Sequence, residues 1–318
     1  QAGIITTSEH TNAKIVEIRG HRLHDALEQG HIVLVAGFQG VSLEANVTTL
    51  GRGGSDATAV ALAAALGADA CEIYTDVDGV FTADPRVVPN ARKLHFISFE
   101  EMLEMASSGA RVLMLRSVEF ARNYNVRLHV RSSLHDEQGT WVGEADHRME
   151  DAIISGVTHD ELQAHVTITN VPDKPGNAAR IFGAMAGLGV NVDMILQTPA
   201  VGGVTDVAFT LPSGDVKRSS ETLDGIATSI GADGWKVDDE IGVVSLIGAG
   251  MKTHPGIAAK MFATLADNNI NLQMIATSPI KISCVIPTAE VHDAVRCLHD
   301  AFDLAAASEL RDHEPVEG

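Results

Sequence analysis

Leu50-Gly51-Arg52-Gly53-Gly54-Ser55-Asp56 separates an apolar run, His31–Phe38, from an alanine-rich run, Asp56–Leu66. The apolar run has the composition of a strand that is covered on both faces. The alanine-rich run predicts a helix with Ser55 or Asp56 as its N-cap. Glycines let backbone N–H groups approach a ligand, a helix N-terminus favours anions, and an arginine can bind a carboxylate or phosphate through two hydrogen bonds. The stretch therefore predicts a site for an anionic substrate.

The segments that follow predict the rest of an α/β domain over residues 1–145. A strand is expected at Cys71–Val77, which would complete a right-handed βαβ unit in a parallel sheet. Ser98-Phe99-Glu100-Glu101 has the capping-box pattern and predicts a helix to about Ser107. A further helix is expected at Val118–Tyr124, and strands are expected at Val126–Arg131 and Thr140–Val142.

Polar side chains follow the predicted strand at Cys71–Val77. Thr75 and Asp76 stand where ligands bind in open α/β sheets, beyond the carboxyl end of a strand. The acidic pattern around Asp76 is not that of a calcium loop, because Val87 occupies the twelfth position, which needs a bidentate acid. Asp84-Pro85 is either a simple β-turn or, with Arg86, part of a phosphate site.

Composition restricts the partners of the chain. The formal net charge of −19 over 318 residues disfavours nucleic acid and anionic membranes. No apolar run is long enough to span a bilayer, and no signal peptide opens the chain. The three cysteines lack metal or redox spacing, which is typical of reduced thiols in the cytoplasm. The fourteen histidines are scattered without paired ligand spacing, so no metal site is predicted.

The second half of the chain contains an internal repeat. Pro175-Gly176 and Pro255-Gly256 are 80 residues apart, and at this offset Asn191 matches Asn271 and Met194 matches Met274. Each copy reads strand, Pro-Gly turn, helix, strand, strand, helix, and the second copy has no clear last strand. We expect Asp151–Val157 to supply it. The first module then covers residues 163–238 and is inserted into the second, which covers 151–160 and 241–304, and residues 305–318 form a flexible tail.

Taken together, these segments resemble the aspartate kinase (aspartokinase) family, and most closely its lysine/threonine-regulated bacterial type. The matching segments are Val35–Gly40, Thr48–Asp56, Thr75–Phe81, Ala83–Arg86, Phe99–Ala106 and Gly109–Leu113. The repeat resembles the paired ACT modules of that family. The resemblance implies an α/β fold: an incomplete amino-acid-kinase-like parallel-sheet sandwich followed by two ferredoxin-like βαββαβ ACT modules.

The family transfers the γ-phosphoryl group of ATP to the side-chain carboxylate of L-aspartate, so the resemblance implies ATP and Mg²⁺ as cofactors. The implied aspartate-binding residues are Phe38, Arg52, Gly53, Gly54, Ser55 and Asp56. The implied nucleotide-binding residues are Thr75, Asp76, Phe81, Thr82, Ala83, Asp84, Pro85, Arg86 and Arg111, the last replacing a usual lysine. No residue is assigned to a metal. The family's Lys-Tyr/Phe-Gly-Gly-Ser segment is not found, so its catalytic lysine is expected upstream of Gln1, and we expect this chain to be a fragment with little activity alone.

The Pro-Gly loops resemble the effector sites of the ACT modules, so lysine or threonine is the implied effector. The implied effector-binding residues are Asp173, Lys174, Pro175, Gly176, Asn177, Ala178, Asn191, Val192, Asp193, Gln197, Ile257, Ala258, Asn271, Leu272 and Ser278. A homodimer or a hetero-oligomer joined through these modules is expected. Two alternatives stay open: a non-catalytic amino-acid-sensing regulatory subunit, and another enzyme of the amino-acid-kinase fold that acts on glutamate or a nucleotide.

Overall fold

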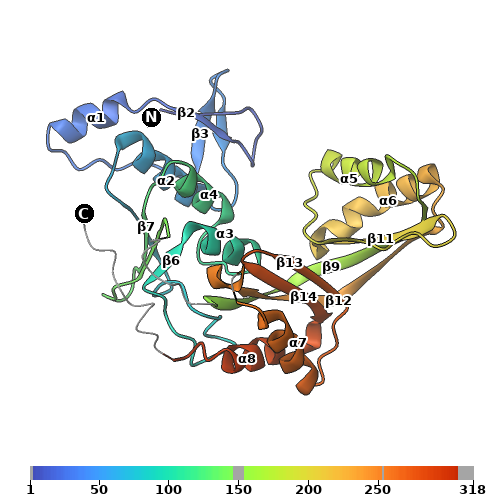
Figure 1. Ribbon diagram of the computed structural model, residues 1–318. Coiled ribbons are helices and arrows are strands. Elements are labelled where there is room, and N and C mark those ends of the chain that lie inside the picture. Colours follow the sequence, from blue (N-terminus) through green and yellow to red (C-terminus); the bar gives the residue numbers. More distant parts are fainter. Residues whose placement is uncertain (1–2, 146–153, 253, 307–318) are drawn as a thin grey trace.

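The computed structural model describes residues 3–145, 154–252 and 254–306, which form three β-sheets with helices packed against them (Figure 1). The first sheet has the order β2-β1-β3-β4, and helix α1 lies beside it. Its elements are β1 (Ile4–Thr6), β2 (Ile15–Ile18), α1 (His21–Glu28), β3 (Gln39–Ser42) and β4 (Val47–Thr49). In the described part of the chain, no helix is long and apolar enough to cross a membrane.

The strand predicted at His31–Phe38 is not formed. Residues 31–37 are irregular, and the side chains of Ile32 and Leu34 are 95% and 97% exposed. A strand needs hydrogen-bond partners, and this segment pairs with none of the described strands, so its apolar sequence alone does not make it a strand. The predicted βαβ unit therefore lacks its first strand.

The second sheet has the order β5-β7-β8-β6. Strands β5 and β7 are parallel, as are β6 and β8, whereas β7 and β8 are antiparallel. The elements of this part are α2 (Gly54–Leu66), β5 (Cys71–Thr75), β6 (Phe96–Ser98), α3 (Phe99–Ser107), α4 (Leu115–Asn123), β7 (Leu128–Ser132) and β8 (Thr140–Gly143). Strand β6 was not predicted, and the other helices and strands confirm the predictions for this region to within a few residues at each end.

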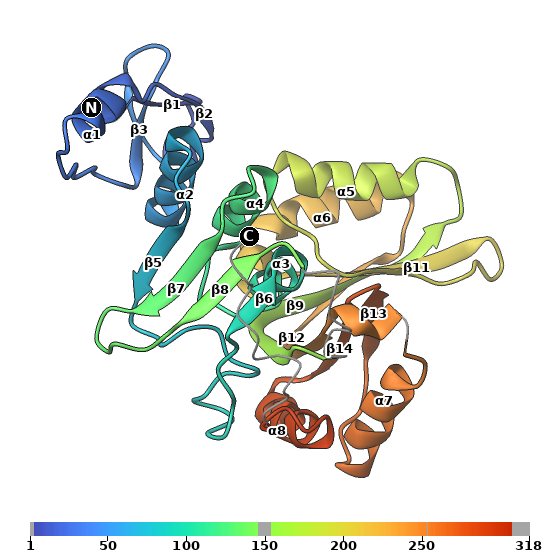
Figure 2. The ribbon, with the colours of Figure 1, turned by 60° about the vertical axis from the view of Figure 1, so that its left-hand side comes forward.

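The third sheet contains both repeats in the order β10-β11-β9-β12-β14-β13 (Figures 1 and 2). Each copy covers its part of the sheet with two helices. The elements are β9 (Gly156–Pro172), α5 (Asn177–Gly187), β10 (Ile195–Gln197), β11 (Val204–Pro212), α6 (Val216–Ile230), β12 (Gly234–Ile247), α7 (Ile257–Asp267), β13 (Met274–Ser278), β14 (Lys281–Pro287) and α8 (Val291–Ala301). The short 3₁₀ turns Ser213–Asp215, Ala249–Lys252 and Thr288–Glu290 precede α6, α7 and α8.

Two long strands pass from one module to the other. The first half of β9 pairs with the end of β12, where Gly156 lies opposite Ile247. Its second half pairs with the start of β12, where Thr169 lies opposite Gly234. The strand predicted at Asp151–Val157 to complete the second module starts only at Gly156, since Ile154 and Ser155 are not in a strand, and from there it lies in that module's sheet. Asp151–Ile153 lie outside the described residues, as do residues 307–318 of the predicted tail.

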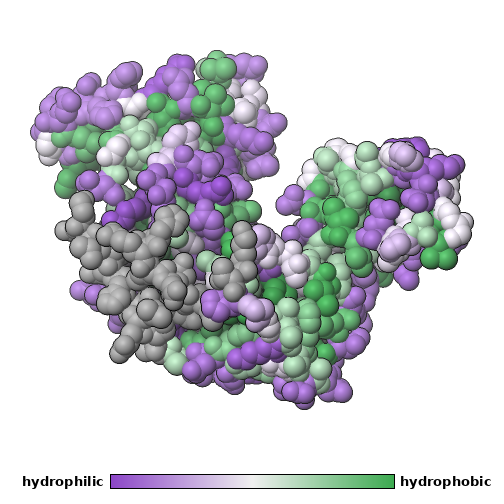
Figure 3. Space-filling view, in the orientation of Figure 1, coloured by the Kyte–Doolittle hydropathy of each residue, from purple (hydrophilic) through white to green (hydrophobic). Residues whose placement is uncertain are grey.

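Both long strands carry a β-bulge at the crossing. On β9, Glu161 and Leu162 lie opposite the single residue Gly242, and on β12, Asp239 and Glu240 lie opposite Ala164. A bulge bends its strand and redirects the side chains beside it. The bulges therefore mark the junction of the two modules, and the first module projects away from the rest of the molecule (Figure 3).

The second module packs against the segment that follows β5. Ala83, Val87 and Val88 belong to the same hydrophobic core as residues of α7 and α8. The Val157 N–H donates to the carbonyl of Thr82 at 2.8 Å. The capping box that was predicted at the start of α3 is present, and its Glu101 carboxylate also accepts hydrogen bonds from the Ser155 hydroxyl and, at 3.1 Å, from the Ala249 N–H. One buried side chain thus caps a helix and joins the two regions.

Candidate active and effector sites

The loop before α2 is shaped by glycine. Gly53 is the N-cap, with a φ of 70°, and a Cβ at this position would lie 2.1 Å from the Met114 Cγ. The prediction of Ser55 or Asp56 as the N-cap is therefore wrong: the chain turns into the helix earlier, at a left-handed residue that favours glycine. The first N–H groups of α2 lack a side-chain cap, which leaves the positive end of the helix open to an anion.

Three predicted substrate residues surround this helix start. Arg52 is exposed and forms no hydrogen bond or ion pair with any residue that the structure describes. Ser55 is exposed in the first turn of α2, and burial raises the pKa of the Asp56 carboxyl beside it. A free guanidinium and a carboxylate within one loop can bind the two charged groups of an amino acid.

Phe38 is held over the start of α2 by its backbone. It adopts a φ of 74°, its N–H donates to the Thr58 hydroxyl at 3.2 Å, and its carbonyl accepts from the Leu50 N–H at 2.9 Å. The side chain remains 45% exposed. A Cβ on Gly54 would lie 3.1 Å from its ring, so Phe38 and the glycine loop form one packed unit.

Arg116 on α4 supports this loop and was not identified from the sequence. Its Nη1 donates to the Leu50 carbonyl at 3.0 Å, and its Nη2 donates to the Ala13 carbonyl at 2.8 Å. The guanidinium thereby joins two loops that are far apart in the sequence. An arginine in an amphipathic helix carries no local signal of such a role, because its partners are backbone carbonyls.

The predicted nucleotide residues Thr75 and Asp76 lie at the carboxyl end of β5, as expected. The Thr75 hydroxyl donates to the Asp76 carboxylate at 3.1 Å, and its carbonyl accepts from the Ser133 hydroxyl at 2.9 Å. Thr75 lies opposite Ser132 in the parallel ladder, so both strands end at the same edge. Ser132 and Ser133 therefore join this edge, and the signal that could have revealed them is the polar run after β7.

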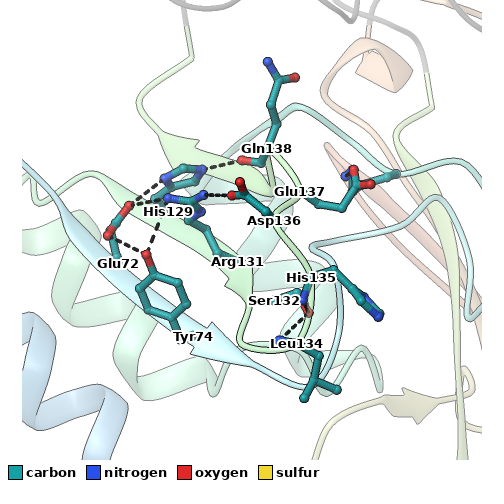
Figure 4. A network of polar contacts seen from close by, with 11 residues as sticks. Glu72, Tyr74, His129, Arg131, Ser132, Leu134, His135, Asp136, Glu137 and Gln138 are labelled. Carbon is teal, nitrogen blue, oxygen red and sulfur yellow. Dashed lines mark hydrogen bonds and ion pairs between the residues drawn. The ribbon is translucent and has the colours of Figure 1, made fainter.

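A polar network stiffens this edge of the sheet (Figure 4). Glu72 accepts hydrogen bonds from the Tyr74 hydroxyl at 3.0 Å and from Arg131 at 3.4 Å. Beyond the strands, His135 lies 2.9 Å from Asp78, and this hydrogen bond holds the pKa of the Asp78 carboxyl below its usual range. The loop after β7 is thus fastened to the loop after β5.

The predicted nucleotide segment Phe81–Arg86 divides into two parts. Thr82 and Ala83 are buried against the second module, where Thr82 lies 3.0 Å from His299, so their side chains are not accessible to a nucleotide in this structure. Phe81 is partly buried, whereas Pro85 and Arg86 are exposed. The Arg86 Nη2 donates to Asp84 at 2.6 Å, and hydrogen bonds to Arg86 lower the pKa of Asp84.

Arg111 lies in the loop between α3 and α4, which contacts both β9 and the glycine loop. Its side chain is 66% exposed and lies 4.0 Å from Asp160 on β9. A Cβ on Gly109, in the same loop, would lie 1.9 Å from the His159 carbonyl. The loop ends at Met114, which packs on Gly53. Residues 109–114 therefore contact both the glycine loop and β9.

The structure does not join the two halves of the predicted active site. In the described part of the chain, no hydrogen bond or ion pair links residues 52–56 to Thr75, Asp76 or residues 81–86. The carboxylates of Asp76, Asp78 and Asp84 lie in the segment after β5 and can supply oxygen ligands to a metal ion. Such ligands fit Mg²⁺, which is ordinarily held by one or two carboxylates together with phosphate oxygens.

The two Pro-Gly loops have the same geometry. Gly176 and Gly256 are the N-caps of α5 and α7, with φ values of 97° and 100°. In the first loop, Asp173, Lys174 and Pro175 are exposed, and the Asn177 side chain donates to the Pro172 carbonyl at 2.8 Å. In each loop a glycine turn leads directly into a helix whose first N–H groups have no side-chain cap.

The remaining predicted effector residues follow these loops. Asn191, Val192 and Asp193 were expected on a strand with Gln197, but β10 begins only at Ile195. The Asp193 N–H donates to the Thr210 carbonyl and the Met194 N–H donates to the Thr210 hydroxyl, which replaces regular pairing there. The others lie at the start of α5, at the start of α7, before β13 and at its end: Ala178, Ile257, Ala258, Asn271, Leu272 and Ser278.

The two predicted half-sites lie at opposite edges of one sheet. Gln197 is on β10 and Ser278 is on β13, which are the outermost of the six strands. Five strand spacings of about 4.8 Å separate them by roughly 24 Å. A single small effector cannot contact both half-sites of one chain.

Comparison with known proteins agrees with this architecture. The amino acid kinase family matches residues 1–132, and the ACT domain matches residues 165–224 and 244–302. The chain is 56% identical to an aspartokinase of Mycolicibacterium smegmatis over 97% of this chain and 75% of that protein. It is 50% identical to an aspartokinase of Corynebacterium glutamicum, again over 97% and 75% of the two chains.

Two crystal structures of E. coli aspartokinase III are also similar. The complex with aspartate and ADP has a TM-score of 0.79 and 27% identity, over 94% of this chain and 68% of that one. The complex with lysine and aspartate has a TM-score of 0.71 and 28% identity, over 95% and 68% of the two chains. The kinase match to the first region disfavours a purely regulatory subunit. The chain therefore belongs to the aspartokinase family, whose members join an amino acid kinase domain to ACT domains.

Proposed function

We propose that this chain binds L-aspartate at the start of α2 and forms part of an enzyme that phosphorylates the side-chain carboxylate of L-aspartate with ATP, giving 4-phospho-L-aspartate. This reaction is the first step of lysine, threonine and methionine (diaminopimelate) biosynthesis in this family. The observation that carries the proposal is Arg52, an exposed guanidinium without a partner among the described residues, beside the uncapped start of α2. The similar E. coli enzyme whose complex contains aspartate and ADP supports the same assignment.

In this proposal each group of aspartate has its own partner. Arg52 binds the α-carboxylate through two hydrogen bonds, and the α2 N–H groups add to that attraction. Asp56 and Ser55 hold the ammonium group, and Phe38 covers the pocket. Gly53 and Gly54 keep the backbone close enough to the substrate.

ATP is assigned to the edge formed by the ends of β5 and β7. Asp76 is exposed at this edge, so its carboxylate is available to hold Mg²⁺, which would neutralise charge on the phosphates when bound. Arg86 and Arg111 are exposed cations that can bind phosphate oxygens. The Arg86 side chain is 88% exposed, so a phosphate can compete with Asp84 for its guanidinium. Transfer of this kind depends mainly on positioning and on neutralisation of charge.

The test is aspartate binding by calorimetry. We expect Arg52→Ala to weaken the affinity at least 30-fold, because a charge-assisted pair contributes about 2 kcal/mol. Arg52→Lys should recover only part of this loss, because lysine lacks the planar fork. Arg22→Ala, an exposed arginine on α1, is the matched control. Equal affinity in the Arg52→Ala and Arg22→Ala variants would refute the assignment.

Catalysis is tested by formation of aspartyl hydroxamate from ATP, aspartate and hydroxylamine. We expect the chain as given to have little activity alone, so its turnover is compared with that of a version extended by the Lys-Tyr/Phe-Gly-Gly-Ser segment of a relative. Equal turnover of the two would contradict it. Binding of lysine or threonine without any binding of aspartate would instead favour the amino-acid-sensing subunit.

We further infer that lysine or threonine binds between the ACT modules of two chains, since the half-sites of one chain lie at opposite edges of its sheet. The edge strand β10 exposes Ile195 and Leu196, at 55% and 43%, which is apolar surface that a second chain would cover. The E. coli enzyme whose complex contains lysine supports lysine as one effector. Sedimentation with and without each amino acid tests this arrangement, and a chain that stays monomeric while it binds an effector would refute it.

We also propose the limits of the two ACT modules that the repeat predicts, and we propose that the protein is cytoplasmic. The pairing of β9 with β12 supports an insertion of the first module into the second.

A further inference from the structure

Three metal-ligating side chains meet outside the candidate active and effector sites. His159 and Glu161 are on β9, and His292 is in the first turn of α8. One ligand atom of each lies within 4.8 Å of the others, and this is the one such group found among the described residues. The His292 Nε2 lies 3.0 Å from the Glu161 Oε1, and the two histidine rings meet edge to face at 5.6 Å.

The bulge on β9 builds this cluster. His159 and Glu161 are two residues apart, so a strand places them on the same face. Glu161 is one of the two bulged residues opposite Gly242, and the Leu162 N–H donates to the Asp160 carboxylate at 3.0 Å, which fixes the bend. A Cβ on Gly242 would lie 2.5 Å from Val291, so α8 starts directly against this bulge and brings in His292.

The donor set is that of a divalent transition metal. Two imidazoles and one carboxylate form a common three-residue set for Zn²⁺, with bonds of 2.0–2.2 Å, so tetrahedral donors stand roughly 3.3 Å apart. The Glu161–His292 pair is already near this separation. Closing the remaining gaps needs side-chain movements of at most roughly 1.5 Å. The nearby acids Asp84 and Asp160 add negative charge, although Arg86 and Arg111 partly offset them.

We propose that His159, Glu161 and His292 form a Zn²⁺-type metal site, with a fourth position open to water. The bound ion would fasten the start of α8 to the bulge at which the two modules join. The carboxylate and the imidazoles contribute all three protein ligands, so the site uses none of the cysteines. It is independent of the proposed kinase reaction, because none of its ligands belongs to the aspartate or nucleotide residues.

The experiment titrates the metal-free full chain with Zn²⁺ by calorimetry and with Co²⁺ by absorption spectroscopy. We expect one Zn²⁺ per chain. With Co²⁺ we expect visible bands of four-coordinate cobalt without the intense near-ultraviolet band of a thiolate ligand. His159→Gln and His292→Gln should each weaken the affinity at least 10-fold, and the double variant should abolish binding.

Two control variants separate this site from other metal binders. His21→Gln removes an exposed histidine on α1 and should leave the affinity unchanged. Cys297→Ser removes the partly buried thiol on α8 and should also leave it unchanged. Thermal unfolding without metal checks that the variants fold, and Zn²⁺ should raise the midpoint of the wild type but not of the double variant. No binding at micromolar Zn²⁺, binding that survives the double variant, or loss of binding in Cys297→Ser would overturn the proposal.

Discussion

The substitution Thr82→Val tests the contact between the segment after β5 and the second module. The Thr82 side chain is fully buried, and its hydroxyl lies 3.0 Å from the Nε2 of His299, which is also fully buried on α8. Valine has nearly the same shape but no hydroxyl, so His299 loses this partner without a change in packing volume. The same hydroxyl accepts from the Arg92 N–H at 2.9 Å.

The size of the effect follows from the cost of leaving a buried polar group without its hydrogen bond, which is about 2 kcal/mol. For a folding unit of about 150–250 residues, a loss of about 2 kcal/mol lowers the unfolding midpoint by about 4–8 °C. The assay is thermal unfolding by calorimetry, together with hydrogen exchange at the Val157 amide. That N–H donates to the Thr82 carbonyl, so its exchange reports on the junction itself.

Two variants serve as controls. Thr82→Ser keeps the hydroxyl and removes one methyl group, which should cost about 1 kcal/mol. Thr264→Val removes a hydroxyl that donates to the Lys260 carbonyl on the exposed side of α7, and it should change stability by less than about 0.5 kcal/mol. Equal stability of Thr82→Val and Thr82→Ser, or unchanged exchange at Val157, would refute this role of the Thr82 hydroxyl.

Three further predictions concern other parts of the molecule. Arg116→Ala should remove two charge-assisted hydrogen bonds from the glycine loop, costing about 2–4 kcal/mol, and should expose that loop to proteolysis; wild-type protease resistance would contradict this. Burial lowers the pKa of His299, so the unfolded chain takes up a proton before the folded chain does, and stability should fall as the pH drops below about 6.5 and be retained above it. Urea unfolding between pH 5 and 8 measures this slope, which should be smaller in His299→Gln. Gly176→Ala, at a φ of 97°, should cost about 1–2 kcal/mol, whereas Gly214→Ala, with open space around it, should be nearly neutral in thermal unfolding.

Local sequence rules were sufficient where the interactions are local. The capping box at Ser98 and Glu101 predicted the start of α3 because both of its hydrogen bonds lie within four residues. The alanine-rich run predicted α2, and the offset of the repeat predicted the paired modules, because these signals need no knowledge of distant partners. The Pro-Gly turns before α5 and α7 were predicted for the same reason.

The residues that the sequence misassigned depend on distant partners. His31–Phe38 has a strand composition but no neighbouring strand among the described residues, so it stays irregular. Thr82 reads as part of a ligand-binding motif, yet it is buried against α8, which is more than 200 positions away in the chain.

The glycine loop also combines features set by the local sequence with features set by distant residues. The sequence determined that a glycine-rich loop with Arg52 precedes a helix, because glycine, arginine and helix propensity are properties of the local chain. Only the tertiary structure decided which groups hold that loop, through Arg116 and Met114 on a later segment. It also brought His159, Glu161 and His292 together, because a β-bulge and a helix start from opposite ends of the second region meet there. The sequence specifies the chemistry of each side chain. The distances between these groups depend on how segments far apart in the sequence pack together.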